Sequence, residues 1–352
     1  MNHSRCVTSH IGALIVAGLA FLASPLHAGA SELLITNVGD SAFFDDSVKR
    51  YDGTTGAFLS TFTYGLFEPT GLVFGADGNL YVANRFSDSV TRYDGTTGAL
   101  IDVFAQSGGL DSPTDLVFGP DGNLYVVSPT THDVRRYDGT TGAFIDIFAT
   151  GGLNTPMSLA FGPDGNLYVA NYWGHNIWRY DGTTGASMGI FAFGGMDFPL
   201  GITFGPDGNL YVAGTILSTN SSGIYRYNGT TGADMGAFIL GGYGPGYGTL
   251  LPTGLVFGPD GNLYVASYQT NDVRRFDGTT GAFIDVFASG GGLVGPVDLA
   301  FSPQAAVPEP DTVALVIIGL VGLAAARWTT VTRHAFAIAR STADRPRAPS
   351  RT

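Results

Sequence analysis

The sequence predicts an all-β protein, a six-bladed β-propeller with four-stranded antiparallel blades. One observation is a repeated motif, of which Phe118-Gly-Pro-Asp-Gly-Asn-Leu-Tyr-Val126 is one copy; near copies begin at Phe74, Phe118, Phe161, Phe204 and Phe257. They follow at steps of about 43 residues, once about 53, which is the period of a propeller blade. A second motif, Arg-Tyr-Asp-Gly-Thr-Thr-Gly-Ala, keeps the same step and is present with small changes in every repeat.

Each repeat contains four short strands, A to D in chain order. Apolar residues lie on both faces of these strands, as expected for stacked blades that cover each other. Strands B, C and D begin at Leu33, Val48 and Ala57 without an A strand before them, whereas residues 297–301 form an A strand with nothing after it. We therefore expect the last blade to be closed by pairing of the N- and C-terminal strands, which leaves no long free edge.

The A-to-B and C-to-D connections are nearly identical in all repeats, and we call the side that they form the uniform rim. Gly-Pro-Asp-Gly-Asn and Asp-Gly-Thr-Thr-Gly have the residues that tight turns require. We interpret their aspartates as turn formers, because their spacing is not that of an EF-hand loop. Arg136 and Asp146 fall on one face of neighbouring strands and are expected to form a diagonal ion pair, and Asp102 and Asp285 offer the same pairing in two other repeats.

The charge and cysteine content exclude several classes of function. The chain carries a formal charge of -12, and residues 31–306 contain 26 acidic and 10 basic residues, a local balance of -16, so nucleic acid is not expected as a partner. Cys6 is the only cysteine and precedes an apolar run, which excludes disulfides and cysteine metal sites in the mature protein. Only His132 and His175 lie within the repeats.

The N-terminus has the features of a secretory signal. Arg5 precedes an apolar run over 11–23, and Ala28-Gly29-Ala30 is a small-residue site that signal peptidase accepts. The alternative is a membrane anchor, but the run is shorter than the roughly 20 residues that a bilayer requires. We expect residues 1–30 to be removed and the propeller to occupy 31–302.

Near the C-terminus, Pro308, Glu309 and Pro310 are followed by an apolar run over 313–326 and by Arg327. This order resembles the PEP-CTERM sorting signal. It implies processing by an exosortase in a Gram-negative envelope, transient anchoring in the inner membrane, and delivery to the cell surface or the extracellular matrix. The chain departs from the pattern because 25 residues follow Arg327.

These features divide the C-terminal part into three segments. We expect a linker with the PEP motif over 303–311, an apolar transmembrane sorting segment over 312–327, and an arginine-rich tail over 328–352 that stays in the cytoplasm. Permanent membrane anchoring without cleavage is the alternative.

The repeat itself resembles NHL-type and streptogramin-lyase-like propeller repeats. The residues that carry the resemblance are Gly-Pro-Asp-Gly-Asn-Leu-Tyr-Val-Ala and the Arg-Tyr-Asp that follows, and it covers nearly the whole mature domain. It implies the fold. It does not imply one function, because such repeats occur in binding proteins, lactonases and lyases alike.

The opposite side, which we call the variable rim, consists of the B-to-C and D-to-A connections. Propellers commonly bind ligands at such a rim and at the mouth of the central channel. The candidate ligand-binding residues are aromatic or polar: Arg85, Phe86, Tyr172, Trp173, Tyr243, Tyr247, Tyr268 and Gln269. They suit stacking on sugars or packing on a protein; the alternative is that they only pack the rim.

Two sets of residues are candidates for chemistry. His132 and His175 are the catalytic candidates, although they precede strand C where other repeats have Asp46, Asp88, Ser222 or Asn271, so a hydrogen-bonding turn residue also explains them. The candidate metal ligands are oxygen donors suited to Ca²⁺, namely Asp115, Asp298, Asn84 and Asn171. Against a metal, the two aspartates belong to blades two apart, and water would satisfy the same groups.

The sequence favours a secreted, surface-sorted binding module for a glycan, an exopolysaccharide matrix or a protein. It shows no evident catalytic site and predicts no cofactor other than the candidate Ca²⁺. The alternative is a lyase or lactonase that uses a divalent cation at the channel mouth. A passive spacer in the envelope is a third hypothesis.

Overall fold

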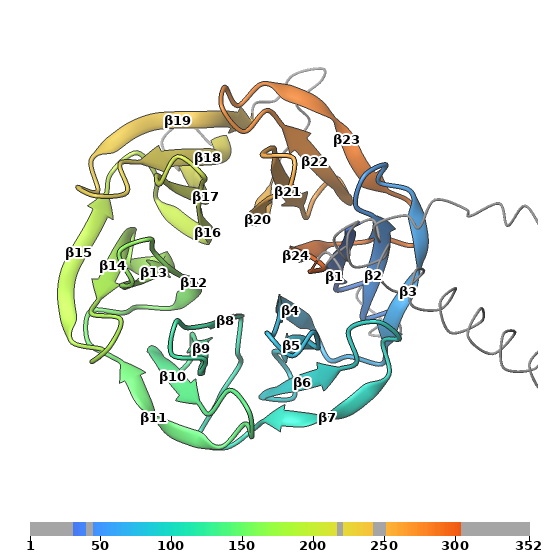
Figure 1. Cartoon of the computed structure of the whole chain (residues 1–352). Coiled ribbons are helices and arrows are strands. Elements are labelled where there is room, and N and C mark those ends of the chain that lie inside the picture. The colour runs from blue at the N-terminus through green and yellow to red at the C-terminus, as the bar shows by residue number, and fades with distance from the viewer. Residues whose placement is uncertain (1–30, 40–44, 217–220, 242–250, 304–352) are drawn as a thin grey trace, which may run out of the picture. The chain divides into compact units, whose positions relative to one another are not determined.

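The computed structural model describes residues 31–39, 45–216, 221–241 and 251–303, which belong to one compact unit. Six four-stranded antiparallel sheets stand around a central axis (Figure 1). We number these blades along the chain, and in each the strands follow the predicted order from the axis outward.

The first three blades have these bounds. The first contains β24 (Pro296–Phe301), β1 (Glu32–Asn37), β2 (Ser47–Asp52) and β3 (Phe58–Tyr64). The second contains β4 (Pro69–Phe74), β5 (Leu80–Asn84), β6 (Ser89–Tyr93) and β7 (Leu100–Ala105). The third contains β8 (Asp115–Phe118), β9 (Leu124–Ser128), β10 (Asp133–Tyr137) and β11 (Phe144–Ala149).

The other three blades follow the same plan. The fourth contains β12 (Pro156–Phe161), β13 (Leu167–Asn171), β14 (Asn176–Tyr180) and β15 (Ser187–Phe193), with the 3-10 helix η1 (Tyr172–Gly174) between its middle strands. The fifth contains β16 (Phe198–Phe204), β17 (Leu210–Ile216), β18 (Ser221–Tyr227) and β19 (Asp234–Gly241). The sixth contains β20 (Pro252–Phe257), β21 (Leu263–Ser267), β22 (Asp272–Phe276) and β23 (Phe283–Ser289).

As predicted, the ring closes in the blade that is formed by both ends of the chain, which is the first blade in our numbering. The last strand, β24, pairs antiparallel with β1, and Leu33 lies opposite Phe301. Beyond the end of the ladder, the Ser302 amide donates to the Glu32 carbonyl at 2.8 Å. Because the chain begins with three strands and ends with one, this pairing is what completes the sixfold count.

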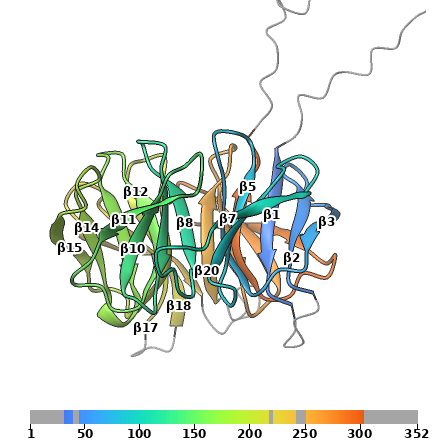
Figure 2. The ribbon, with the colours of Figure 1, turned by 90° about the horizontal axis from the view of Figure 1, so that it is seen from below.

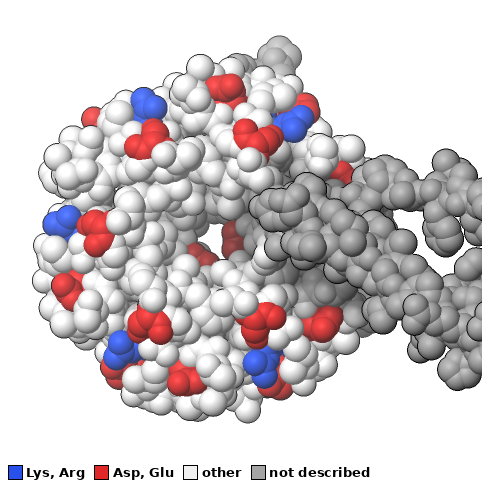
Figure 3. All heavy atoms as spheres, viewed as in Figure 1, with Lys and Arg blue, Asp and Glu red and all other residues white. Residues whose placement is uncertain are grey.

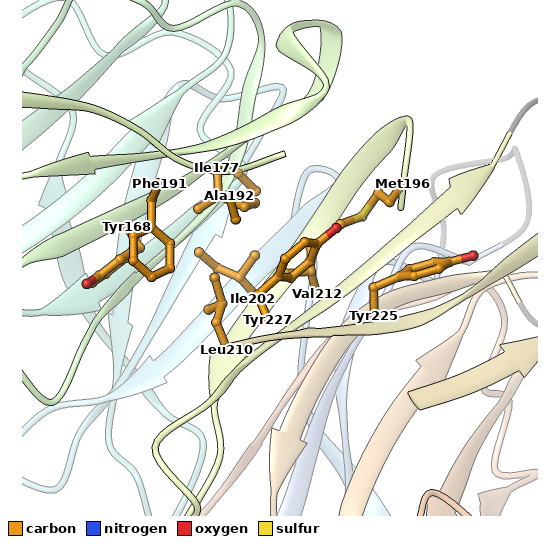
Figure 4. Packing of buried hydrophobic residues seen from close by; sticks show 11 residues of the cluster. Tyr168, Ile177, Phe191, Ala192, Met196, Ile202, Leu210, Val212, Tyr225 and Tyr227 are labelled. Atoms are coloured by element: carbon orange, nitrogen blue, oxygen red, sulfur yellow. The ribbon is translucent and has the colours of Figure 1, made fainter. Parts of the chain in front are cut away.

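The apolar core lies between neighbouring blades. The tyrosine of strand B shows how it is built: Tyr125 packs edge-on against Phe148 of its own blade, at a centroid distance of 4.8 Å, and against Phe161 of the next blade, at 5.0 Å. Figure 4 shows part of the core between the fourth and fifth blades, where Tyr168 and Phe191 face Ile202 and Leu210. Strand B is buried on both faces because neighbouring blades cover it.

The turns of the uniform rim are built as the sequence predicts, with aspartates that accept hydrogen bonds. In the A-to-B turn, Asp121 accepts a bond of 2.9 Å from the hydroxyl of Tyr125. In the C-to-D turn, one oxygen of Asp138 accepts the amides of Thr140 and Thr141 at 3.1 and 2.8 Å and the Thr141 hydroxyl at 2.8 Å. Figure 2 shows the ring from the side, with its two rims at opposite ends of the strands.

The ion pair expected between Arg136 and Asp146 is present, but its predicted diagonal geometry is wrong. The two residues lie directly opposite each other, because the register shifts between Arg136 and Tyr137. Counting symmetrically from the turn would place Phe144 opposite Arg136, but Phe144 pairs with Tyr137 and the shift moves Asp146 into register. A β-bulge of this kind leaves no mark in the hydrophobic pattern.

Several predictions concern residues outside the described ranges. They are the signal sequence, the sorting segment with Pro308, Glu309, Pro310 and Arg327, the basic tail, and the rim residues Tyr243 and Tyr247. Within the described ranges, no helix has the length and apolar character needed to cross a membrane.

Candidate functional site

A cavity of about 270 Å³ lies at the axis. Figure 3 shows the opening at the centre of the ring, with acidic atoms inside it. Residues at the start of the innermost strands and in the variable-rim connections line the cavity: Val38, Glu68, Thr70, Arg85, Thr114, Asp115, Met157, Ser158, Leu200, Gly201, Thr253, Gly254, Tyr268, Val297 and Asp298. The structure therefore brings four of the predicted residues, Arg85, Tyr268, Asp115 and Asp298, into one site.

The position of the lining residues follows from the way each innermost strand begins. Each innermost strand has a proline at its start or within two residues of it, and the third residue after that proline is leucine or isoleucine packed into the core. In three blades the residue that follows this proline is threonine, and its hydroxyl donates to a carbonyl of the following blade, as Thr114 does to the carbonyl of Met157 at 2.9 Å. These hydroxyls therefore join blades around the cavity.

The two aspartates also join blades. Asp115 accepts the Leu116 amide at 2.8 Å, and its other oxygen accepts the hydroxyl of Ser158 at 2.6 Å and the amide of Leu159 at 3.1 Å. Asp298 accepts the amide of Leu72 at 3.1 Å. Each carboxyl group thus caps an amide of the following blade.

Burial raises the pKa values of both aspartates. For Asp298 the nearby charge of Asp115 raises the pKa further. Their blades are separated by the second blade, and neighbouring residues of that blade lie against both: a Cβ on Gly71 would lie 2.8 Å from Asp115 Oδ1, and the Leu72 amide donates to Asp298. The cavity therefore contains a pair of acids that favours holding a proton.

The donor set does not fit a calcium ion. Calcium takes six to eight oxygen ligands, whereas the oxygens of Asp115 already accept hydrogen bonds from amides. Within the described ranges, no group of three or more acidic, histidine or cysteine side chains could hold a metal. The other predicted ligands, Asn84 and Asn171, are not among the lining residues; Asn171 instead donates to the Gly152 carbonyl at 3.0 Å.

The mouth of the cavity has an ion pair and an exposed aromatic ring. Arg85 lies 3.1 Å from Glu68, and the Tyr268 side chain is exposed. Glu68 was missed by sequence reasoning, although a signal exists: it is the only acidic residue directly before an innermost-strand proline. The predicted Phe86 and Gln269 are also exposed, in the B-to-C connections of the second and sixth blades.

An aromatic cluster lies on the variable rim between the fourth and fifth blades. Trp173, which is 54% exposed, contacts Tyr172 and Phe198 edge-on at centroid distances of 5.2 and 5.1 Å. Tyr172 stacks on Phe198 at 4.8 Å. The His175 ring lies 5.0 Å from Phe198. The exposed indole is therefore held in place by its neighbours.

The two histidines hold connections of the variable rim. Nδ1 of His132 accepts the amide of Thr155 at 2.9 Å, and Nδ1 of His175 contacts the carbonyl of Asp197. In other blades, oxygens of Asp88 and Asn271 accept the amides of Ser112 and Gly295, both at 2.8 Å, as His132 accepts the amide of Thr155. All four residues, the two histidines, Asp88 and Asn271, have positive φ. The turn interpretation accounts for these contacts, and a catalytic role stays a prediction.

Comparison with known proteins identifies the fold and nothing narrower. No family model and no curated protein match the sequence. Solved structures with a similar fold do match. A chain from the crystal structure of a nidogen/laminin complex matches with a TM-score of 0.63 and 17% identity, over 78% of this chain and 100% of that chain.

Two lyase structures match less closely. A streptogramin B lyase gives a TM-score of 0.47 and 17% identity, over 75% of this chain and 76% of that chain. A virginiamycin B lyase from Staphylococcus aureus gives 0.45 and 17%, over 61% and 68%. The six four-stranded sheets and the match to the nidogen/laminin chain confirm the predicted six-bladed propeller, whereas the choice between a binding module and a lyase is not resolved.

Proposed function

We propose that this protein is a binding module that takes a glycan on its variable rim. The observation that carries the proposal is Trp173, an exposed indole whose position is fixed by Tyr172 and Phe198. An aromatic ring that is ordered before binding loses little conformational entropy when a ligand stacks on it. Its flat apolar face suits the C–H face of a sugar ring.

The polar groups of the same rim support a sugar ligand. Arg85 and Glu68 at the cavity mouth offer charged donors and acceptors, and the cavity lining adds threonine hydroxyls. A ligand rich in hydroxyl groups can satisfy both kinds of partner. The similar chain from the nidogen/laminin structure belongs to a protein complex, so the test must distinguish a glycan ligand from a protein ligand on this rim.

We propose that the protein is located at the cell surface. The N-terminal signal and the PEP-type motif support export, anchoring by the C-terminal apolar segment, handling by an exosortase, and release to the surface or matrix. Mass spectrometry of both termini of the protein recovered from cells and medium would test this. Retention of residues 313–326 in all recovered protein would contradict sorting by cleavage.

Glycan-array binding of the domain spanning residues 31–303 tests the function. We expect Trp173→Ala to lower affinity at least about fivefold, since stacking on an aromatic ring contributes about 1–3 kcal/mol. Ile101→Ala, which truncates an exposed side chain on β7, is the matched control and should bind like the wild type. Equal binding by both variants, or binding only to proteins in a matrix extract, would contradict the glycan proposal.

A second candidate is a lyase or lactonase, and the observation that favours it is the cavity with two buried acids. An acid that holds a proton at neutral pH can serve as a general acid. Asp298→Asn would then abolish turnover of a lactone or streptogramin while leaving the fold intact. An inactive wild type, assayed with divalent cations added, would remove this candidate.

A further inference from the structure

The cavity at the axis has a polar side and an apolar side. Each blade lines it with one or both of the residues that follow the proline of its innermost strand. The first three blades contribute, among others, two acids and two threonines: Asp298, Thr70, Thr114 and Asp115. The fourth and fifth blades, which stand across the axis from the first two (Figure 1), contribute Met157 and Leu200. A ligand that fits this cavity therefore has a polar part and an apolar part.

The serine and threonine hydroxyl groups of the lining have already donated their protons. Three threonines donate to carbonyls of the following blade at 2.9 to 3.0 Å, namely Thr70, Thr114 and Thr253. Ser158 donates to Asp115 at 2.6 Å. Because a hydroxyl group has one proton and two lone pairs, these side chains can only accept further hydrogen bonds. This part of the lining therefore favours a ligand that donates them.

The carboxyl groups of the lining also have unused acceptor positions. Oε2 of Glu68 is buried and has no hydrogen-bond partner among the described residues, although Oε1 contacts Arg85. An ionised carboxylate accepts about four hydrogen bonds, whereas the described residues donate three to Asp115 and one, from the Leu72 amide, to Asp298. Both aspartates keep part of their surface exposed to the cavity, and Figure 3 shows acidic atoms inside the opening. A donor that enters the cavity can therefore reach free acceptor positions.

The charge of the lining favours a cation. Arg85 is the one basic side chain among the lining residues, and Glu68 pairs with it at 3.1 Å. Asp115 and Asp298 are thus left without a counter-charge from the lining. Burial raises the pKa of both aspartates, and the charge of Asp115 raises the pKa of Asp298 further. Keeping both carboxyl groups ionised is therefore unfavourable unless a positive charge is bound beside them.

We propose that the cavity at the axis binds a primary alkylammonium group, with the ammonium against Asp115 and Asp298 and the alkyl chain against Met157 and Leu200. An ammonium group has three donors and no acceptor, and it therefore complements a lining of acceptors. It needs only three acceptor positions, whereas calcium would need six to eight oxygen ligands. The cavity volume of about 270 Å³ is slightly below the roughly 300–1,000 Å³ of typical ligand pockets, so the ligand is a small amine or a single lysine side chain.

This site is separate from the one in the proposed function. Trp173, on which the proposed glycan stacks, is not among the residues that line the cavity. Trp173→Ala should therefore leave amine binding unchanged. Failure of the glycan proposal would also leave this inference intact, because the two ligands are tested on different residues.

Calorimetric titration of the domain spanning residues 31–303 with n-butylamine at neutral pH tests the inference without any variant. The control ligand n-butanol keeps the alkyl chain but has no charge, and butyltrimethylammonium keeps the charge but has no donor. We expect both controls to bind at least about tenfold more weakly, since they lose the hydrogen bonds to charged groups. Undetectable binding of n-butylamine, or equal affinity for all three ligands, would overturn the inference.

A pair of aspartate variants locates the site. Asp298→Asn removes one carboxylate from the cavity and should lower the affinity for n-butylamine at least about tenfold. Asp138→Asn is the matched control, because it makes the same change of charge in a turn of the uniform rim. The chain itself tolerates asparagine there, since Asn228 has the equivalent place and accepts the amides of Thr230 and Thr231. Equal affinity of Asp298→Asn and Asp138→Asn would refute the cavity as the site.

Two peptides distinguish a free amine from a lysine side chain. A glycine-rich peptide with one central lysine presents the same group on a polypeptide, and the acetyl-lysine peptide removes the charge. Tighter binding of the lysine peptide than of n-butylamine would support a lysine of a partner protein as the ligand, and weaker binding would support a small free amine. Equal affinity for the lysine and acetyl-lysine peptides would contradict recognition of an ammonium group.

Discussion

The two rims of the ring share one strand topology but stabilise it in different ways. On the uniform rim, the same residue forms the same bonds in blade after blade, as Asp121 and Asp138 do in the third. On the variable rim, the residue before the third strand is a carboxylate, an imidazole or an amide, yet Asp88, His132 and Asn271 all accept one amide from the next connection. The repeat therefore conserves a hydrogen bond on this rim while leaving the residue type open.

A glycine substitution tests whether the uniform rim is fixed by contacts between blades. Gly142 has φ 71° and packs against the carbonyl of Phe104 in the preceding blade, which leaves no room for a Cβ. Gly142→Ala should therefore lower the free energy of unfolding by about 3 kcal/mol or more, through backbone strain and displacement of the neighbouring blade. Chemical denaturation measures this.

Gly151→Ala is the matched control on the variable rim. Gly151 has φ 80°, but a Cβ there would meet no heavy atom within 4 Å, so only the backbone strain of about 1–2 kcal/mol remains. Equal losses for Gly142→Ala and Gly151→Ala would show that the contact between blades adds nothing.

The dependence of stability on pH distinguishes the buried aspartates at the axis from the aspartates in the turns. The raised pKa values of Asp115 and Asp298 mean that the folded state binds protons more tightly than the unfolded state. Stability should therefore rise as pH falls from alkaline values towards the ordinary aspartate pKa. In the turns, hydrogen bonds from Thr141 and Thr140 lower the pKa of Asp138, so its contribution is lost at still lower pH. Melting temperature against pH should pass through a maximum in the mildly acidic range.

The variant Asp298→Asn isolates the contribution of the aspartates at the axis to the pH dependence of stability. Without the second carboxyl group, Asp115 loses a repelling neighbour, and the fall of Tm between pH 5 and pH 8 should shrink by several degrees relative to the wild type. An unchanged slope on the alkaline side would mean that Asp298 does not bind its proton more tightly in the folded state.

Substitutions of two polar residues at opposite ends of β9 compare how much each rim contributes to the free energy of unfolding. At the uniform rim, Tyr125→Phe removes one hydrogen bond of 2.9 Å to Asp121. At the variable rim, Ser128→Ala removes a bond of 2.6 Å to the carbonyl of Asp111 and leaves that connection without its partner. We expect losses of about 1 kcal/mol for the first and 1–2 kcal/mol for the second by chemical denaturation. A negligible loss in Ser128→Ala would mean that the variable rim is held by its turns alone.

The smallest effect is expected at His132. His132→Ala removes the acceptor for the Thr155 amide and should cost about 0.5–1 kcal/mol. His132→Asn should restore nearly all of it, because Asn271 has the same role and the same φ of 56° in the sixth blade. If the histidine were catalytic, His132→Asn would abolish activity while keeping stability, so both variants should also be assayed with lactones.

The sequence by itself determined the fold. Local chemistry is sufficient for this, because a turn such as Gly-Pro-Asp-Gly-Asn dictates its own conformation and the period of the turns dictates the number of blades. The closure of the ring followed from counting strands at the ends, and the pairing of β24 with β1 confirmed it.

The tertiary structure decided which distant groups meet. Asp115 and Asp298 are far apart in the chain and belong to different blades, and only the closed ring places them in one cavity, where their pKa values rise. Likewise, the bulge that sets Asp146 opposite Arg136 has consequences only in three dimensions. Turn conformation depends on neighbours in sequence, whereas burial and electrostatic coupling depend on neighbours in space.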